Sequence, residues 1–224
     1  MKNLLLVIFG LTGLSLFAQT SPASVRQIAP GAMENFSALL NNPSAVQPTK
    51  ATAMGKNWFR METDAHVFTD EVSFKQVVAI LLDLDNQTKY FNGKKNKLTA
   101  TVVSRDASGA IFDFVSITPV MGLQIKTPYR SLVTVPENSD TAAYIEFRQL
   151  DSDTDSNKNI KNCFSARYAQ AVTVNGKTYT YVRFYIFDEV NASVLPGARN
   201  ILESSSDAAN AEALQLLIAA AKTK

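Results

Sequence analysis

The 224-residue sequence has one cysteine, Cys163, and one histidine, His66. A single cysteine excludes a disulfide within the chain, so stability has to come from a hydrophobic core. A zinc site needs several His or Cys ligands, and His66 has no such companions. The sequence also has no nucleophile-elbow motif around a serine. We therefore interpret Cys163 as a small buried residue and His66 as a surface or strand residue, and we expect no metal and no cofactor.

An excess of charge of one sign is missing as well. Lys and Arg number 22 and Asp and Glu number 20, which gives a formal net charge of +2. No basic stripe is interleaved with aromatic residues, and this argues against nucleic-acid binding. The apolar fraction of 46% is ordinary for a globular protein. The chain is therefore long enough for one domain with a substantial core.

A long apolar run occurs at the start of the chain, and no second one follows. Lys2 precedes the apolar residues 4–17, and the small residue Ala18 ends the run. This pattern predicts a secretory signal peptide over residues 1–18. The alternative is an uncleaved anchor, although the run is shorter than the ~20 residues of a spanning helix. We expect a bacterial protein that is exported to the periplasm or secreted, with cleavage near Ala18.

Residues 19–56 are rich in Ser, Pro, Ala, Asn and Thr, and four prolines interrupt them. This composition predicts an N-terminal extension or linker with a short helix over 33–40. Residues 57–224 are predicted to form the folded domain.

The domain is predicted to begin with a strand over 58–68 and two short helices. Ser73 and Gln76 form a capping-box pattern ahead of an apolar run, which predicts the start of the first helix. Asp85 is expected to cap the second helix, which ends at Asn92-Gly93.

After Gly93 the hydrophobic period changes to two, which predicts antiparallel strands joined by short turns. The expected strands are 97–105, 110–118, 122–135, 141–150, 160–174 and 177–190. Asn175-Gly176, between the last two, is a strong signal for a two-residue hairpin turn.

The last stretch, 196–222, reads as one long helix or as two helices that meet near 204–206. Pro196 suits a first helical position. One face is apolar but mostly small, and it carries Ala198, Leu202, Ser205, Ala209, Ala213, Leu216 and Ala220. A helix that only fills a core would carry more Leu and Ile there. We predict that it packs on a sheet and leaves a cavity beneath its first half, while the Leu216 end anchors it.

The element order resembles the START-like (SRPBCC) superfamily, which includes lipid-transfer domains, polyketide cyclases and plant pollen allergens. Residues 72–83 resemble the first helix of that family, and Tyr90-Phe91 resemble the aromatic pair that closes the second. Leu195-Pro196 before the last helix is also similar to the family. The resemblance implies an α+β helix-grip fold, in which a curved antiparallel sheet wraps around a long C-terminal helix. It also implies an internal cavity for a lipid, sterol or other hydrophobic ligand.

The hairpin turn predicts which residues share a face. With Asn175-Gly176 as the turn, Arg167 lies opposite Phe184 and Ser165 lies opposite Ile186. This face is smaller and more aliphatic than the tyrosine-rich opposite face, so we place it under the last helix. Arg167 then lies in the cavity, where a guanidinium can hold a carboxylate or phosphate. The alternatives are that the faces are reversed or that Arg167 extends to the sheet edge.

Nine further residues are predicted to contact the ligand because they are apolar or small and face the same cavity. They are Phe112, Phe114, Ile125, Phe147, Phe184, Ile186, Leu202, Ser205 and Ala209. The phenylalanines among them are equally consistent with core packing.

The acidic loop 151–159 matches the D-x-D-x-D start of a calcium-binding EF-hand loop. It departs from that motif because Ser156 replaces the glycine and Asn162 replaces the glutamate. Predicted strands flank the loop in place of helices. We therefore favour a solvated hairpin loop.

The sequence predicts an exported binding protein that holds or carries a hydrophobic small molecule or lipid and touches membranes transiently. The alternative is a START-like enzyme of the cyclase or hydrolase type that acts on a hydrophobic substrate. No catalytic set is marked in the sequence, so we predict no catalytic residues. A third interpretation is a secreted interaction module with a filled cavity. The oligomeric state is not indicated.

Overall fold

The computed structural model describes residues 35–95, 97–120, 123–150, 159–192 and 197–224. The predicted signal peptide, Pro196 and most of the acidic loop, 151–158, lie outside the described residues. Within those ranges, no helix combines the length and apolar character that a membrane span requires.

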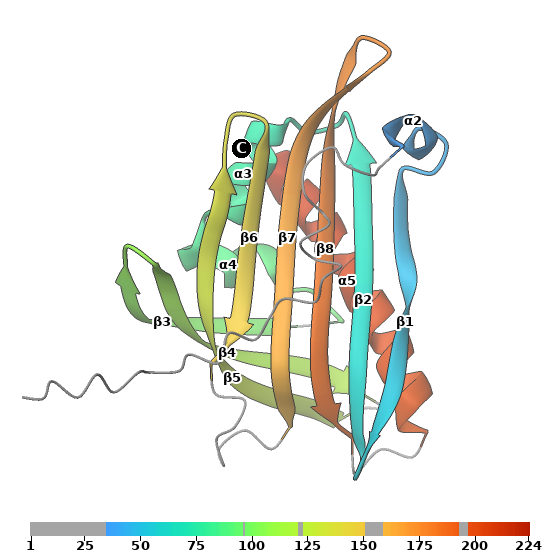
Figure 1. The fold of residues 1–224 in the computed structure, drawn as a ribbon, viewed down its shortest axis with the longest axis vertical. Helices are drawn as coiled ribbons and strands as arrows, with labels where there is room; N and C mark the ends of the chain where they lie inside the picture. The colour runs from blue at the N-terminus through green and yellow to red at the C-terminus, as the bar shows by residue number, and fades with distance from the viewer. Residues whose placement is uncertain (1–34, 96, 121–122, 151–158, 193–196) are drawn as a thin grey trace, which may run out of the picture.

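The described strands form one curved antiparallel sheet of eight, in the order β1-β2-β8-β7-β6-β5-β4-β3 (Figure 1). Their bounds are β1 Ser44–Gly55, β2 Trp58–Thr69, β3 Lys97–Asp106, β4 Gly109–Val120, β5 Leu123–Asn138, β6 Ala142–Gln149, β7 Ile160–Val174 and β8 Lys177–Asn191. β2 pairs with β8 along its whole length, which joins the start of the domain to its end. The six predicted later strands are confirmed, as is the α+β helix-grip architecture.

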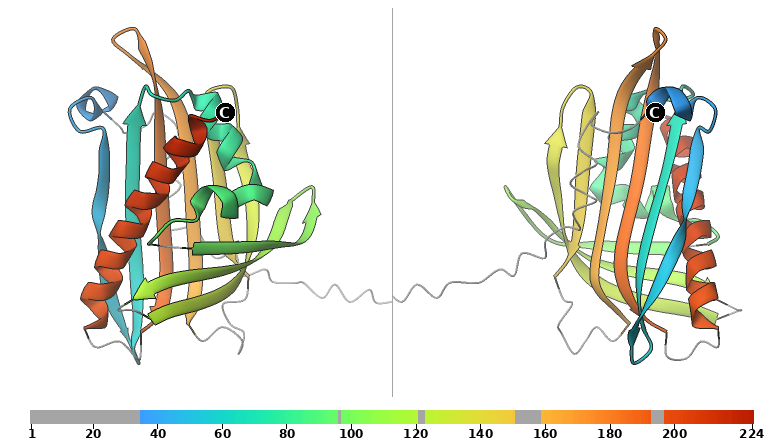
Figure 2. Two further views of the ribbon diagram at one scale, coloured as in Figure 1. Left: turned by 180° about the vertical axis from the view of Figure 1, so that it is seen from behind. Right: turned by 45° about the vertical axis from the view of Figure 1, so that its right-hand side comes forward.

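Five described helical segments accompany the sheet: α2 Phe36–Leu39, α3 Phe74–Leu81, η1 Leu84–Asn86, α4 Gln87–Phe91 and α5 Ala198–Ala221. α5 is a single continuous helix. It crosses one face of the sheet with α3 and α4 beside it, and β3, β4 and β5 bend round toward it (Figure 2).

The first short helix begins where the sequence predicts, but the second does not. The Ser73 backbone N–H donates to Gln76 Oε1 at 2.9 Å, and the Gln76 N–H donates to Ser73 Oγ at 3.3 Å. Asp85 does not cap α4, because a 3-10 turn, η1, comes first and contains it. The exposed Asp85 carboxylate instead forms an ion pair with Arg105.

The stretch 44–55, expected to belong to an N-terminal extension, is the edge strand β1. Its hydrophobic pattern is weak, because only Thr49 and Ala51 are buried. Pro48 lies where the register shifts between Gln47 and Lys50, a break that an edge strand tolerates. The sheet therefore begins before residue 57.

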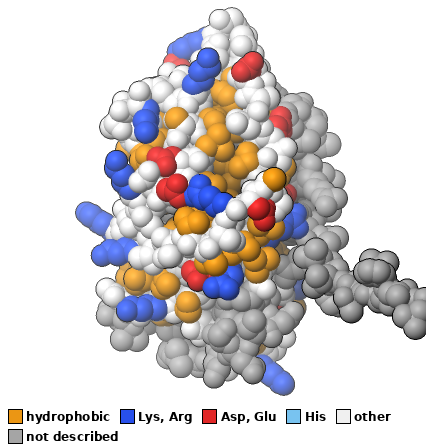
Figure 3. All heavy atoms as spheres, turned by 90° about the vertical axis from the view of Figure 1, so that its left-hand side faces the viewer, with side chains coloured by type: hydrophobic (Ala, Val, Ile, Leu, Met, Phe, Trp, Pro, Cys, Tyr) orange, Lys and Arg blue, Asp and Glu red, His pale blue; other side chains and the backbone are white. Residues whose placement is uncertain are grey.

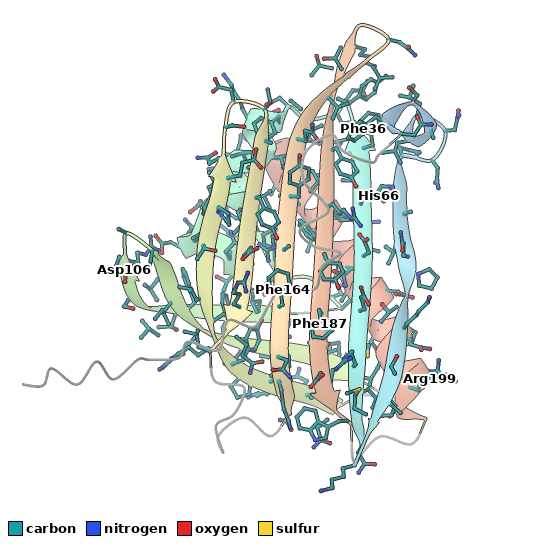
Figure 4. The ribbon with its side chains drawn as sticks, viewed as in Figure 1. Phe36, His66, Asp106, Phe164, Phe187 and Arg199 are labelled. Carbon is teal, nitrogen blue, oxygen red and sulfur yellow. The ribbon has the colours of Figure 1, made fainter. Side chains whose placement is uncertain are left out.

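Hydrophobic side chains cover both faces of the sheet. The inner cluster lies between the sheet and α3, α4 and α5 and includes Ile145, Val182 and Leu217. The outer cluster includes Phe164, Tyr168, Tyr181 and Tyr185, and α2 packs against it through Phe36. Figure 4 labels Phe36, His66, Phe164 and Phe187 on this outer side. The predicted assignment of the two faces is confirmed.

Candidate functional site

A cavity of about 550 Å³ lies between α5 and the inner face of the sheet. Side chains of β2, β5, β7 and β8 form its wall, and α5 forms its roof. α4, β3, β4 and the residues flanking β7 and β8 contribute further lining. Its size falls within the roughly 300–1,000 Å³ of typical small-molecule sites.

Seven of the ten predicted ligand-contacting residues line this cavity. They are Ile125, Arg167, Phe184, Ile186, Leu202, Ser205 and Ala209. Phe112, Phe114 and Phe147 do not line it, because they pack in the inner core with 2%, 3% and 7% of their surface exposed. Phe114 stacks between Phe112 and Tyr129 at 5.5 Å from each ring, so these aromatics support the wall from behind.

The predicted register of the last hairpin is confirmed. Arg167 lies opposite Phe184, and Ser165 lies opposite Ile186. Asn175 and Gly176 adopt positive φ angles of 52° and 78°, as a two-residue hairpin turn requires. Every second residue of β7 and β8 therefore faces α5, and this brings Arg167 into the cavity.

Gln87 positions the Arg167 side chain. The Gln87 amide is 1% exposed, and its nitrogen donates to the carbonyl oxygens of Ile80, Leu81 and Asp83 at 3.3, 3.4 and 3.1 Å. These bonds to the end of α3 turn the amide oxygen toward Arg167, whose Nη1 donates to it. Sequence reasoning missed Gln87 because its role depends on bringing the end of α3 next to Arg167 on the distant strand β7.

Three phenylalanine rings surround the Arg167 guanidinium. Its central carbon lies 4.3 Å from the ring centroid of Phe91, 4.7 Å from that of Phe147 and 5.4 Å from that of Phe184. Ring faces attract a cation electrostatically. Burial lowers the pKa of Arg167 to about 10, so the group remains positively charged at neutral pH.

Within the described ranges, no carboxylate forms an ion pair with Arg167. Gln87 occupies one of its nitrogens, and the side chain still borders the cavity. A guanidinium has five N–H donors in a fixed fork that matches a carboxylate or phosphate. The arrangement can therefore present a charged, largely unused donor group to a molecule in the cavity.

Tyr129 and Asp188 are among the further polar residues that line the cavity, and the sequence did not single them out. Burial raises the pKa of the Tyr129 hydroxyl far above its ordinary value, so this group stays neutral. Burial, with the charge of Glu189 adding to it, raises the pKa of the Asp188 carboxyl to about 7. Side chains along β8 alternate between the two faces of the sheet. Extending this alternation by two residues beyond Ile186 would have placed Asp188 on the cavity face. The described residues contain no group of three or more potential metal ligands.

Carboxylates hold α5 against the sheet and the α4–β3 loop. Asp207 Oδ1 accepts from the Thr49 N–H at 2.8 Å, and Glu203 Oε1 accepts from the Ala51 N–H at 3.0 Å. On the other side of the helix, Glu212 accepts from the backbone N–H groups of residues 94 and 95, both at 2.8 Å. These contacts therefore hold the helix over the cavity on two sides, at β1 and at the α4–β3 loop.

The roof is longer than predicted. Its lining runs from Ile201 to Leu216, so the Leu216 end belongs to the cavity and does not only anchor the helix. Leu214, Leu217 and Ala221, at most 5% exposed, provide the anchor instead.

No protein-family model matches the sequence, and no curated protein sequence matches it. Solved structures are similar to it in fold. Human STARD10 aligns with a TM-score of 0.51 at 10% identity, covering 85% of this chain and 80% of that one. Human StAR-related lipid transfer protein 5 aligns with a TM-score of 0.51 at 13% identity, covering 84% and 93%.

The aromatase/cyclase Zhui from Streptomyces sp. R1128 aligns with a TM-score of 0.49 at 14% identity, covering 72% of this chain and 93% of that one. At such identities the two human structures establish the fold alone. Together with the eight-stranded sheet, the early helices and the long last helix, they show that this chain has the START-like helix-grip fold.

Proposed function

We propose that the protein is an exported carrier that binds an apolar molecule with an anionic head group in the cavity beneath α5. The observation that carries this proposal is Arg167, a cation surrounded by phenylalanine rings in the cavity without a carboxylate partner in the described structure. An anionic group on a ligand would supply the missing counter-charge.

The rest of the cavity suits the apolar part of such a ligand. Ile125, Ile186, Leu202 and Ala209 line it, and burying apolar surface against them would contribute roughly 25 cal/mol per Å². One of the two human structures with this fold is, by its name, a lipid transfer protein. Export rests on the signal-peptide pattern of residues 1–18.

Contact with a membrane fits the same proposal, since a carrier has to load and unload its ligand. Val102 and Val103 on β3 are 42% and 46% exposed. Figure 3 shows hydrophobic patches among Lys, Arg, Asp and Glu side chains on the face that carries β3. We infer that this face touches lipid transiently.

The test is to express the full chain in a bacterial host, purify it, denature it and examine the extract by mass spectrometry. We expect a bound molecule with a carboxylate or phosphate group, and we expect fluorescent fatty acids to bind the emptied protein. An empty extract together with no response to a panel of fluorescent lipids would reject the proposal.

A second candidate function is an enzyme that acts on a hydrophobic substrate. It is favoured by Tyr129, Arg167 and Asp188, three ionisable groups that line one cavity. An acid whose pKa lies near 7 suits proton transfer at neutral pH. If this is correct, a bound molecule recovered after incubation differs in mass from the molecule supplied, and Asp188→Leu abolishes the difference.

A further inference from the structure

Asp188 lies on the inner face of β8 and lines the cavity at a different level from Arg167. Side chains alternate along a strand, so Phe184, Ile186 and Asp188 face the same side, and all three line the cavity. Arg167 pairs with Phe184, four residues before Asp188. At the rise of a β-strand, the two polar groups start from levels roughly 13 Å apart.

A β-bulge in β7 lies directly opposite Asp188. Lys161 pairs with Glu189 and Phe164 pairs with Phe187, so Asn162 and Cys163 together oppose this one residue. Asn162 has a positive φ of 51° and donates its amide to Glu189 at 3.0 Å. The Cys163 N–H donates to Gln149 Oε1 at 2.9 Å. The bulge is thus fixed by bonds that leave these donors turned away from Asp188.

The Asp188 carboxyl has no hydrogen-bond donor among the described residues. Its Oδ1 is a buried atom without a partner, and no ion pair reaches it. The charge of Glu189, which has the same sign, further raises the pKa of Asp188. Leaving a buried polar group without a partner is costly, so such a group calls for a partner that the chain itself does not provide.

Arg167 and Asp188 do not neutralise each other. They form no ion pair, and the apolar side chain of Ile186 lies between their levels on β8. Tyr129 lies within the electrostatic influence of both, since Arg167 lowers its pKa and Asp188 raises it. The cavity therefore has a cationic region at Arg167 and an acidic region at Asp188, and Ile186 lies between their levels, flanked by Ser165 and Thr63.

We propose that Asp188 binds a hydrogen-bond-donating group, a hydroxyl or an amine, at the far end of the ligand whose anionic group lies at Arg167. The inference rests on the proposed function and narrows its ligand class. The ligand is an elongated apolar molecule with an acid at one end and a donor group roughly 13 Å away. Ile125, Ile186 and Leu202 contact its apolar middle.

The experiment uses the full chain, freed of bound lipid, and three named probes in isothermal titration calorimetry. Dodecanoic acid supplies the acid and the apolar chain. ω-Hydroxydodecanoic acid adds a hydroxyl at the far end, and β-hydroxydodecanoic acid carries the hydroxyl beside the acid. We expect the ω-hydroxy acid to bind roughly tenfold more tightly than dodecanoic acid, and the β-hydroxy acid to gain nothing.

Two variants separate the hydrogen bond that Asp188 accepts from the space that its side chain fills. Leucine matches aspartate in shape but accepts no hydrogen bond, so Asp188→Leu should abolish or reverse the preference for the ω-hydroxy acid while dodecanoic acid still binds. Asp188→Asn keeps an acceptor oxygen and should keep part of the preference. Thermal melting of both variants confirms that they fold.

The outcomes distinguish failure of the Asp188 inference from failure of the proposed carrier function. If dodecanoic acid and the ω-hydroxy acid bind native protein equally well, Asp188 does not recognise a donor and this inference is overturned, while the carrier function stands. A preference that survives in Asp188→Leu overturns it as well. If no acid binds, the proposed function fails and the inference fails with it.

Discussion

The guanidinium of Arg167 contacts three phenylalanine rings and one amide oxygen, and each contact restricts where its charge can lie. A charged side chain that is fixed in place loses little further entropy when it binds an anion. Gln87 is central to this arrangement, because the same buried amide also holds the end of α3.

Gln87→Leu tests this double role. The substitution removes the donor to the carbonyls of Ile80, Leu81 and Asp83 and the acceptor for Arg167. We expect the free energy of unfolding to fall by roughly 1–3 kcal/mol, because buried polar partners are left unpaired. Urea denaturation measures the change, with Lys75→Gln on the exposed side of α3 as the control. Equal stability of the two variants would show that Gln87 holds nothing in place.

Asp188 makes stability depend on pH in a predictable direction. Its pKa is about 7 in the folded chain, against about 3.9 for an unfolded aspartate. Between about pH 4 and pH 7 the folded chain holds a proton that the unfolded chain has lost, so this residue removes stability as the pH rises. Above about pH 7 the penalty is complete.

Asp188→Asn should therefore be more stable than the native chain at about pH 8, by as much as about 4 kcal/mol, and nearly equal to it at about pH 4. Thermal melting across this pH range measures the difference. A difference that does not change with pH would mean that Asp188 titrates normally and is not buried in the cavity wall.

For single residues, the sequence predicts well which face of the sheet a side chain lies on. It predicts contacts between distant residues poorly. The position of Arg167 on the inner face follows from the Asn175-Gly176 turn, because a two-residue loop sets the register of both strands. The same alternation extends to Asp188. The partnership of Gln87 with Arg167 joins residues 80 positions apart and depends on how α3 and α4 dock, which no local pattern encodes.

α5 is held at its two sides by carboxylates that accept backbone N–H bonds. Asp207 and Glu203 bond to β1, the edge strand, whose outward donors no further strand covers in the described sheet. Covering an edge with a helix protects it from pairing with another chain. The small inward side chains of α5 then leave space between the helix and the sheet.

Filling that space from α5 should block binding without unfolding the chain. Ser205→Leu and Ala209→Leu each place a larger apolar side chain in the cavity roof. We expect at least a tenfold loss of affinity for dodecanoic acid and a change in unfolding free energy of under about 1 kcal/mol. Calorimetry and thermal melting give both values.

Ser204→Leu is the matched control, because Ser204 is the neighbouring serine and is exposed. It should bind dodecanoic acid like the native chain. Unchanged affinity in both roof variants would place the ligand elsewhere.

At the level of elements, the sequence predicts those with a clear period. The six strands after Gly93, the capping box at Ser73 and the last helix all have strong local signals. β1 lacks a strong local signal, because only Thr49 and Ala51 are buried in it and it contains Pro48. The sequence Gly55-Lys56-Asn57 is the signal that could have revealed it, since Lys56 and Asn57, both with positive φ, form the two-residue turn between β1 and β2.

For the whole molecule, the order of elements was enough to predict the fold, because a meander of strands that ends in a long helix has few compact solutions. The cavity was also predictable in outline, since the small face of α5 indicates space beneath it. Its chemistry was not, because Tyr129, Arg167 and Asp188 come from three strands whose curvature brings them to one enclosed volume.

The central claim is that Arg167 holds the anionic group of an apolar ligand. The most direct measurement compares the affinities of dodecanoic acid and dodecanol for the native chain and for Arg167→Gln. We expect the variant to bind the acid at least tenfold more weakly, since a charge-assisted bond contributes about 1.5–3 kcal/mol, and to bind the alcohol almost unchanged. Equal losses for the acid and the alcohol would contradict the account.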